Sequence, residues 1–498
     1  MSRPLRVLLV TPPYHCGVVE SAGVWLPLHL VYLAGAARLA GAEVRILDAM
    51  SRFDTHEDIA RAIEEDRPDV VGVTAITAME PDAREVCAAA KRVDPGILTV
   101  LGNVHPTFCW KEILDADPAV DVVVRGEGEE TFAELLRVRR EGGDLASVAG
   151  LALRRDGAPI ETPARPRALD LDSFDPAWDL VDWPRYLYRP HPDGRLAIVS
   201  SSRGCTYRCS FCSQQKFWER SWRARRPEAF VAEIELLRDR YGVRVAMLSD
   251  ETPTVDPERW KRILDLLIER SVGVELLMET RAQDIVRDEA LLPRYSAAGI
   301  SHIYVGVEST NQATLDLYRK DSKVEESKRA IDLINGHGIV SETSFVLGGP
   351  AETPESIRTT VDLAKWYDPD MAFFLALTPW PYADMYDELR PHVSTRDYRK
   401  YNLVDPILKP LAMEVEDVRR ALLRASGDFW RHRFEGLESM PAAKQDYLIR
   451  VLELLIEHSY LGKEMKCAMG GGGMPAHVKA VLDRVRCHPG REGPRARD

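Results

Sequence analysis

The chain has 498 residues and a formal net charge of −12, and 45% of its residues are hydrophobic while 29% are charged. This length predicts two or three domains, each able to bury an ordinary core. The acidic balance excludes nucleic acids and anionic membranes as principal partners, because both require a basic surface. No stretch approaches the roughly 20 apolar residues of a membrane span, nor does the start resemble a signal peptide. We therefore expect a cytoplasmic protein.

The eight cysteines are best interpreted as reduced thiols, because the cytoplasm does not favour disulfides. Three of them stand close together, at Cys205, Cys209 and Cys212, and the others are scattered. This spacing predicts a group of three ligands and no disulfide framework.

Residues 1–150 alternate short apolar runs with amphipathic segments, which is typical of an α/β domain with a doubly wound, Rossmann-like parallel sheet. The predicted strands cover 6–11, 43–48, 70–74, 98–102 and 120–125, and the predicted helices cover 28–40, 57–65 and 83–93. Ligands of such sheets bind at the carboxyl ends of the strands. The loops that begin at Thr11, Thr74, Gly102 and Gly126 are therefore expected to form one rim.

Residues 151–192 are rich in proline, aspartate and arginine, and we interpret them as an interdomain linker in which Trp178 and Trp183 serve as anchors. Residues 193–400 show a second alternation of strands and helices. Six strands are predicted at 196–200, 243–249, 274–279, 302–307, 341–347 and 371–377. This pattern predicts a partial (β/α)6 TIM-like barrel with its active face at the strand ends. Residues 401–498 are expected to form a helical region with a flexible, glycine-containing tail.

The three clustered cysteines follow directly after the first predicted barrel strand. Thiolates at Cys205, Cys209 and Cys212 are able to hold three irons of a 4Fe–4S cube and to leave the fourth iron open. A structural zinc site requires a fourth ligand nearby. Cys467 and Cys487 are distant in the sequence, so zinc is the weaker alternative.

This C-x3-C-x2-C motif, with Phe211 before its last cysteine, resembles that of radical S-adenosylmethionine (SAM) enzymes. In that family the open iron binds the amino and carboxylate groups of SAM, and one electron from the cluster cleaves SAM to a 5′-deoxyadenosyl radical. The resemblance covers residues 197–376. It implies a 4Fe–4S cluster and SAM as cofactors, and an electron donor such as flavodoxin or ferredoxin as a partner.

Polar residues and glycines at the predicted strand ends are the candidate SAM contacts. The resemblance assigns the methionyl ammonium to the carboxylates of Asp250 and Glu251, the SAM carboxylate to Arg281 and the ribose hydroxyls to Glu308. For each of these residues alone, a helix N-cap or a salt bridge at the barrel rim is the favoured interpretation, and only their common position at strand ends favours a SAM contact. The full set is Phe211, Asp250, Glu251, Thr280, Arg281, Glu308, Gly348 and Gly349.

A doubly wound domain ahead of such a barrel resembles the cobalamin-dependent members of the family. The resemblance implies a corrinoid over the strand ends of the first sheet, where small and hydroxyl side chains leave room for it. The candidate contacts are Tyr14, His15, Gly17, Thr74, Ile76, Thr77, Met79, Gly102, Asn103, His105, Gly126 and Glu127.

One apparent cobalt-binding motif is better explained as a helix start. Residues 54–59 resemble the Asp-x-His-x-x-Gly sequence that supplies an axial histidine in other cobalamin proteins, but they follow the second strand and Ile59 replaces the glycine. We expect Asp54 or Thr55 to be a helix N-cap. The cobalt is therefore expected to lack a histidine from this chain, as is usual in the resembling family.

Residues 13–17, 212–218, 367–372 and 378–381 are similar to the subfamily of anaerobic magnesium-protoporphyrin IX monomethyl ester cyclases. This similarity spans residues 5–410 and fades in the helical tail. The subfamily also contains cobalamin-dependent methyltransferases of secondary-metabolite pathways, including antibiotic biosynthesis. We interpret the chain as a methyltransferase of a small-molecule carbon, by analogy alone. The alternatives are a tetrapyrrole oxidative cyclase, a radical SAM enzyme without cobalamin, and a carrier or sensor without turnover. No catalytic residue is predicted.

Overall fold

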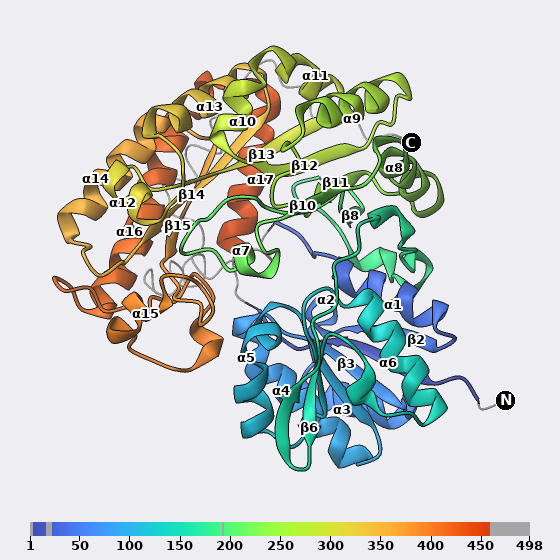
Figure 1. Cartoon of the computed structure of the whole chain (residues 1–498). Helices are drawn as coiled ribbons and strands as arrows, with labels where there is room; N and C mark the ends of the chain where they lie inside the picture. Colours follow the sequence, from blue (N-terminus) through green and yellow to red (C-terminus); the bar gives the residue numbers. More distant parts are fainter. Residues whose placement is uncertain (1–2, 16–21, 192–193, 459–498) are drawn as a thin grey trace.

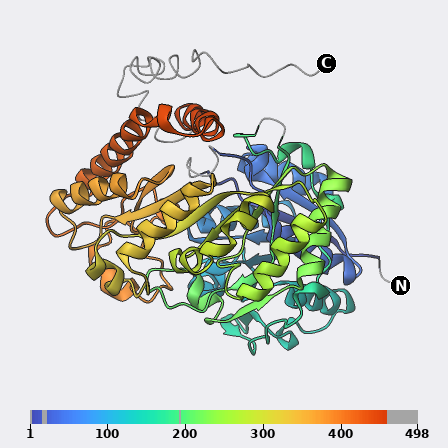
Figure 2. The ribbon, with the colours of Figure 1, turned by 90° about the horizontal axis from the view of Figure 1, so that it is seen from above.

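The structure is a computed structural model that describes residues 3–15, 22–191 and 194–458. Two parallel-sheet domains pack against each other, and the carboxyl-terminal helices lie on the outer side of the second domain (Figures 1 and 2). A search of the described residues for a helix long and apolar enough to cross a membrane finds none.

The first domain is the predicted doubly wound sheet. Its strands have the order β2-β1-β3-β4-β5-β6-β7, and the first five are parallel. These five are β1 (Arg6–Thr11), β2 (Glu43–Asp48), β3 (Val70–Thr74), β4 (Leu98–Gly102) and β5 (Val122–Val124). One face is covered by α1 (Leu28–Leu39) and α6 (Glu129–Glu141), and the other by α3 (His56–Asp66), α4 (Glu80–Val93) and α5 (Val104–Ala116). Thr55 caps α3 through a capping box, which confirms the helix start predicted there.

The predicted boundary at residue 150 is too early. Strands β6 (Leu151–Arg155) and β7 (Ala158–Glu161) form a hairpin, and β6 pairs antiparallel with β5. Leu151 and Ala152 are fully buried. The first sheet therefore extends to residue 161, because the hairpin covers an edge that β5 would otherwise expose.

The rest of the predicted linker is docked through aromatic side chains. Trp178 and Trp183 are buried and their rings lie 5.9 Å apart. Trp178 Nε1 donates to Glu233 Oε1 of the second domain at 3.0 Å. Tyr186 OH donates to Asp48 Oδ2 of the first domain at 2.9 Å. The segment thus joins the two domains by specific contacts.

The second domain contains the six predicted strands in a parallel sheet that runs in chain order, which confirms the partial barrel. The strands are β8 (Leu196–Val199), β11 (Val245–Leu248), β12 (Glu275–Thr280), β13 (Ile300–Glu308), β14 (Val340–Leu347) and β15 (Met371–Ala376). Its principal helices are α8 (Pro227–Tyr241), α9 (Pro257–Glu269), α13 (Val324–Gly336) and α14 (Pro354–Tyr367). A short hairpin of β9 (Ser202–Gly204) and β10 (Trp222–Ala224) flanks the cysteine loop.

The carboxyl-terminal region is helical as predicted, with α16 (Val415–Glu435) and α17 (Ala442–His458). A buried charge network attaches both helices to the barrel. Lys444 Nζ lies 2.5 Å from Asp370 Oδ2, and Arg433 Nη2 lies 3.4 Å from Asp370 Oδ1. A buried charge left without its partner is strongly destabilising, so this network fixes where α17 lies. The glycine-containing tail lies outside the described residues.

The close approach of α1 to residues 175–177 generates a stability prediction. A Cβ added at Gly35 would lie 1.8 Å from Asp175 O, whereas one added at Gly336 would meet nothing within 4 Å. We expect Gly35→Ala to lower the melting temperature by several degrees, as overpacking that costs about 1–3 kcal/mol requires. The matched control Gly336→Ala, at the end of α13, should leave it unchanged or higher. Thermal circular dichroism measures both, and equal melting temperatures would contradict the prediction.

Candidate functional site

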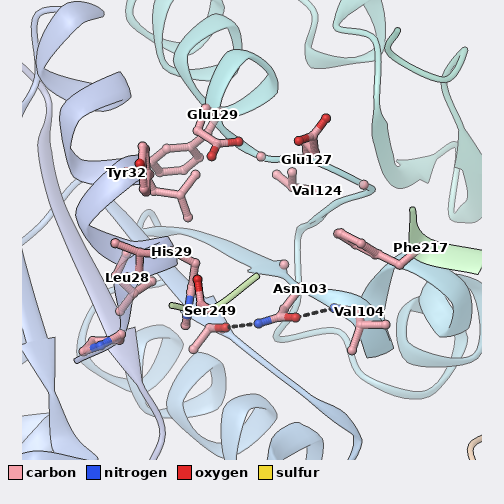
Figure 3. A pocket seen from close by; sticks show the side chains of 18 of the residues that line it. Leu28, His29, Tyr32, Asn103, Val104, Val124, Glu127, Glu129, Phe217 and Ser249 are labelled. Carbon is pink, nitrogen blue, oxygen red and sulfur yellow. Dashed lines mark hydrogen bonds between the residues drawn. The ribbon is translucent and has the colours of Figure 1, made fainter. Parts of the chain in front are cut away.

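One cavity lies between the domains, and we call it the interdomain cavity. Its volume is about 400 Å³, and it is lined by the carboxyl ends of the first sheet, the start of α1 and the ends of β8 and β11. Figure 3 shows His29, Asn103, Glu127 and Phe217 around it. Five residues predicted as cobalamin contacts line it: Thr74, Gly102, Asn103, Gly126 and Glu127.

A tight turn after β4 shapes the floor of this cavity. Asn103 has a left-handed φ of 90°, and its Oδ1 accepts from Val104 N at 2.6 Å. Its Nδ2 donates to Thr74 Oγ1 at 2.9 Å, which joins two neighbouring strand ends. Gly126 also has a positive φ, of 74°, and a Cβ there would meet no atom within 4 Å. The turn therefore leaves open space above the strands.

The deeper part of the interdomain cavity is an apolar slot between the sheet and the pair α1 and α6. Leu9, Leu30, Leu33 and Phe132 line it together with Gly72. A Cβ added at Gly72 would lie 2.9 Å from Leu9 Cδ2, so a larger residue would crowd the floor. A slot of this composition accommodates a planar apolar ring.

His29, which the sequence analysis missed, is exposed to the interdomain cavity from the start of α1. The protein around the cavity desolvates the imidazole and lowers its pKa to about 4, and the charges of Asp48 and Glu129 offset this only in part. His29 is therefore neutral at physiological pH. No motif surrounds it, so only the fold reveals its position.

Glu127 lines the cavity but uses its carboxylate at the domain interface. Its oxygens accept from Arg203 Nη1 at 3.0 Å and from Arg223 Nη1 at 2.9 Å. Burial raises the pKa of Glu127, but the hydrogen bonds and charges of these two arginines outweigh it and lower the pKa below its usual value. This carboxylate therefore holds the barrel against the first domain.

Other predicted cobalamin contacts lie away from the cavity lining. Thr77 Oγ1 lies 2.9 Å from Tyr382 OH and 3.2 Å from His105 Nδ1, so these residues join the first domain to the segment after β15. Burial lowers the pKa of His105 to about 4. His15 stacks on Phe53 at 4.8 Å. Tyr14, Ile76 and Met79 do not line the cavity either, and Gly17 lies outside the described residues.

The cysteine loop carries three free thiols with donors directed at the sulfur atoms. Gln214 N donates to Cys212 Sγ at 3.3 Å. Thr252 Oγ1 lies 4.0 Å from Cys205 Sγ, and Arg281 Nη1 lies 4.0 Å from Cys209 Sγ.

Burial raises the pKa of Cys205 and that of Cys212, the latter to about 12, so these thiols ionise only beside a strong positive charge such as a metal. The described residues include no group of three His, Cys, Asp or Glu placed around one metal ion. In an iron–sulfur cube each cysteine binds a different iron, so the donor set fits such a cluster.

Phe211 and Arg281 hold this loop in place. The Phe211 and Tyr318 rings lie 5.1 Å apart, and Ser210 N donates to Tyr318 O at 2.8 Å. The Arg281 guanidinium lies 3.4 Å from the centre of the Tyr207 ring, and its Nη2 donates to Asp321 O at 2.6 Å. These contacts favour a positioning role for both residues beside their predicted contact with SAM.

Asp250 is fully buried and its carboxylate is satisfied internally. It accepts from Ser201 N at 2.7 Å and from Ser201 Oγ at 2.6 Å, which fixes the turn after β8. Glu251 instead lines the interdomain cavity, with Oε2 accepting from Gly204 N at 3.1 Å and Oε1 accepting from Trp218 Nε1. Of the two adjacent carboxylates, Glu251 is the one that faces open space.

The remaining predicted SAM contacts lie at the ends of β12, β13 and β14. Glu308 has a left-handed φ of 65° and forms a 2.8 Å ion pair with Lys320. Thr280 Oγ1 lies 2.6 Å from Thr254 Oγ1. Gly348 and Gly349 directly follow β14. Gly348 has φ 84°, and its N donates to Glu352 Oε2 at 3.2 Å. The structure thus brings these residues to one rim but gives several of them internal partners.

The second cavity lies inside the barrel, and we call it the barrel cavity. Its volume is about 610 Å³, and it is lined by barrel strands, residues 402–404 and α17. Leu26, Ile198 and Ser249 line both cavities, so the two spaces share a wall.

Glu279 was missed by the sequence analysis and faces the barrel cavity. Burial, together with the nearby charges of Glu251, Asp250 and Glu308, raises its pKa to about 8. The carboxyl is therefore largely protonated at neutral pH. The sequence predicts its neighbour Thr280 as a SAM contact, but the alternation of β12 directs position 279 into the cavity.

Comparisons with known proteins identify the family of this chain. Residues 14–136 match the B12 binding domain, and residues 199–364 match the Radical SAM superfamily. The anaerobic magnesium-protoporphyrin IX monomethyl ester cyclase of Rubrivivax gelatinosus is 40% identical over 82% of this chain and 74% of its own length. This chain belongs to the cobalamin-dependent radical SAM enzymes. Its cofactors are cobalamin, SAM and a 4Fe–4S cluster.

Two further comparisons extend the family. An uncharacterized methyltransferase of Pyrococcus horikoshii is 30% identical over 86% of this chain and 92% of its own. The radical SAM methyltransferase TsrM of Kitasatospora setae has the same fold, with a TM-score of 0.65 over 84% of this chain and 82% of its own at 23% identity. Cyclases and methyltransferases are thus both relatives of this cobalamin-dependent radical SAM enzyme.

The cysteine loop generates the second prediction. We expect Cys209→Ala to lose the visible absorbance and most of the iron of the anaerobically reconstituted protein, because two thiolates do not hold the cube. Cys87→Ala, which removes a buried thiol of α4, serves as the control and should retain both. An iron content equal in both variants would contradict the assignment.

Glu279 generates a pH prediction for the protein without cofactors. Its folded-state pKa of about 8 exceeds the ordinary value of 4.5, so the folded state binds the extra proton within this window and stability falls as pH rises through it. We expect Glu279→Gln to raise the melting temperature at about pH 8.5 and to change it little at about pH 5. The exposed Glu355→Gln should show no such difference, and a pH-independent effect of Glu279→Gln would contradict the prediction.

Proposed function

We propose that this enzyme transfers a methyl group from methylcobalamin to a carbon of a small-molecule substrate of secondary metabolism. The observation that supports the proposal is the shared wall of the two cavities at Leu26, Ile198 and Ser249. A substrate in the barrel cavity would lie beside the interdomain cavity, where five predicted cobalamin contacts meet. When bound, cobalamin supplies the methyl transfer, and the cluster with SAM supplies the radical chemistry.

The residues of the chain hold the reactants and exclude water. Cys205, Cys209 and Cys212 would bind the cluster, and Glu251 presents a carboxylate to the cavity that a SAM ammonium is able to use. Trp218 lines the interdomain cavity and Trp25 lines the barrel cavity. Aromatic walls of this kind keep water from a reactive intermediate.

The second candidate function is oxidative cyclisation of a tetrapyrrole. The 40% identity with the Rubrivivax gelatinosus cyclase favours it. The barrel cavity is a weaker match for that substrate class, because a free propionate would meet the carboxylate of Glu342, and no lysine or arginine is among the described residues that line the cavity.

An electron donor such as flavodoxin or ferredoxin is proposed as the partner. Lys216 Nζ and Arg319 Nη1 lie 3.1 Å and 3.7 Å from the carboxylate of Asp384, and the exposed Arg220 is close enough to lower the pKa of that carboxylate further. Three cationic side chains thus surround the single carboxylate of Asp384, and they lie beside the cysteine loop. A basic rim on an acidic chain steers an acidic donor towards the cluster.

Labelled SAM tests the proposed reaction. The reconstituted protein, with cobalamin and a reductant under anaerobic conditions, should convert [methyl-13C]SAM to S-adenosylhomocysteine, with the label on cobalt and then in the methylated product. The same protein without cobalamin is the control and should form no S-adenosylhomocysteine. Release of 5′-deoxyadenosine with no S-adenosylhomocysteine would favour the cyclase, and the absence of both products would favour a carrier or sensor.

A further inference from the structure

Four polar side chains meet at the amino-terminal end of the barrel strands, far from the cysteine loop. They are Tyr188, His302, Glu342 and Tyr447, which we call the basal cluster, and all four line the barrel cavity. His302 and Glu342 are early residues of β13 and β14, while Tyr447 belongs to α17. The cluster is therefore complete only when α17 docks beneath the barrel.

The hydrogen bonds of the basal cluster are incomplete at one place. Tyr188 OH lies 2.5 Å from Tyr447 OH, and Tyr447 OH lies 3.2 Å from His302 Nδ1. His302 Nε2 lies 2.8 Å from Glu342 Oε2. This nitrogen is nevertheless buried without a partner in hydrogen-bonding geometry.

An unsatisfied nitrogen beside a carboxylate in a cavity wall costs free energy unless a ligand completes the bonds. If Tyr447 OH donates to Nδ1, the imidazole carries its proton on Nε2 and becomes a donor there. A donor and an acceptor then stand side by side at His302 and Glu342. A hydroxyl group, which both accepts and donates, matches this pair.

The rest of the barrel cavity is largely apolar, with side chains from the strands, the loop at residues 403–404 and α17. Its apolar lining includes Met247, Leu277, Met371, Phe373, Leu375, Val451, Leu454 and Leu455. Two carboxyl groups, Glu279 and Glu342, face it as well. An anionic group would meet the carboxylate of Glu342 with no lysine or arginine among the described lining residues to compensate it, whereas an apolar body would be buried favourably.

We propose that the barrel cavity takes an uncharged, largely apolar molecule whose hydroxyl group binds between His302 and Glu342. This deepens the proposed function and rests on it, since it assigns the substrate of the same reaction to this class. The basal cluster thereby sets how deep the molecule enters and which carbon faces the interdomain cavity. Helix α17 contributes to this specificity through Tyr447 and through the apolar residues that it adds to the cavity wall.

Competition against a neutral fluorescent probe tests the proposal in the protein loaded with cluster and cobalamin, so that the interdomain cavity is filled. N-phenyl-1-naphthylamine reports occupancy of the barrel cavity, and dodecan-1-ol, 1-methoxydodecane and dodecanoate are the competitors. We expect the alcohol to displace the probe at about tenfold lower concentration than the ether, because only the alcohol donates to Glu342. Dodecanoate should compete less well than the alcohol.

Two variants make the test specific. His302→Phe should reduce the preference for the alcohol to about twofold or less, since the paired donor is gone. His337→Phe is the matched control, because that histidine bonds to Leu333 O at 2.8 Å and does not line the cavity, and it should keep the preference. If His302→Phe fails to fold by circular dichroism, Glu342→Leu takes its place.

Equal displacement by alcohol and ether, stronger binding of dodecanoate, or a preference that survives His302→Phe would overturn the proposal. So would a probe that does not bind. These measurements need no turnover of SAM. If the alcohol preference is intact but no methyl transfer is observed, the proposed reaction is contradicted and the substrate class is not. If methyl transfer is observed but the alcohol preference is absent, the substrate class is contradicted and the reaction is not.

Discussion

The arrangement of both cavities depends on one buried ion pair network centred on Arg203. This residue precedes Cys205 by two positions, and its guanidinium lies 3.0 Å from Glu127 and 2.7 Å from Glu129 of the first domain. It also lies 5.1 Å from the ring centres of Tyr32 and Phe174. Burial lowers the pKa of Arg203, but the two carboxylates more than compensate and raise it overall. These contacts fix the position of the cysteine loop relative to the strand ends of the first sheet.

Such a network is expensive to break. Removing both Glu127 and Glu129 would leave the buried Arg203 guanidinium uncompensated, and losses of about 3–5 kcal/mol are typical of a buried charge without its partner. Fixed charges at a domain interface contribute orientation more than net stability, because desolvation offsets most of their attraction. In this enzyme orientation is what the chemistry requires, since two cofactors and a substrate have to meet across the interface. In the same way, the ion pairs of Asp370 fix the position of α17, and α17 forms part of the wall of the barrel cavity.

The sequence predicted elements whose signals are local and missed groups whose roles depend on distant partners. The six barrel strands and the cap at Thr55 were predicted because apolar period and capping chemistry act within a few residues. The hairpin β6–β7 was not predicted, because β6 is short and contains two arginines, and its pairing with the edge strand β5 leaves no local pattern in the sequence. His29 and Glu279 were missed for a related reason, since neither stands in a motif and only the fold surrounds them with a cavity.

By itself the sequence determined the two sheet domains, the three-thiol loop and the family, because each is encoded by spacing within one segment of chain. Only the tertiary structure decided which polar groups are available to bind a cofactor. Glu127, Asp250 and Arg281 each carry the right chemistry for a cofactor contact, yet their bonds go largely to Arg203, Ser201 and Asp321. A buried polar group must be satisfied by whatever the fold places beside it, and that neighbour lies tens of residues away in the chain.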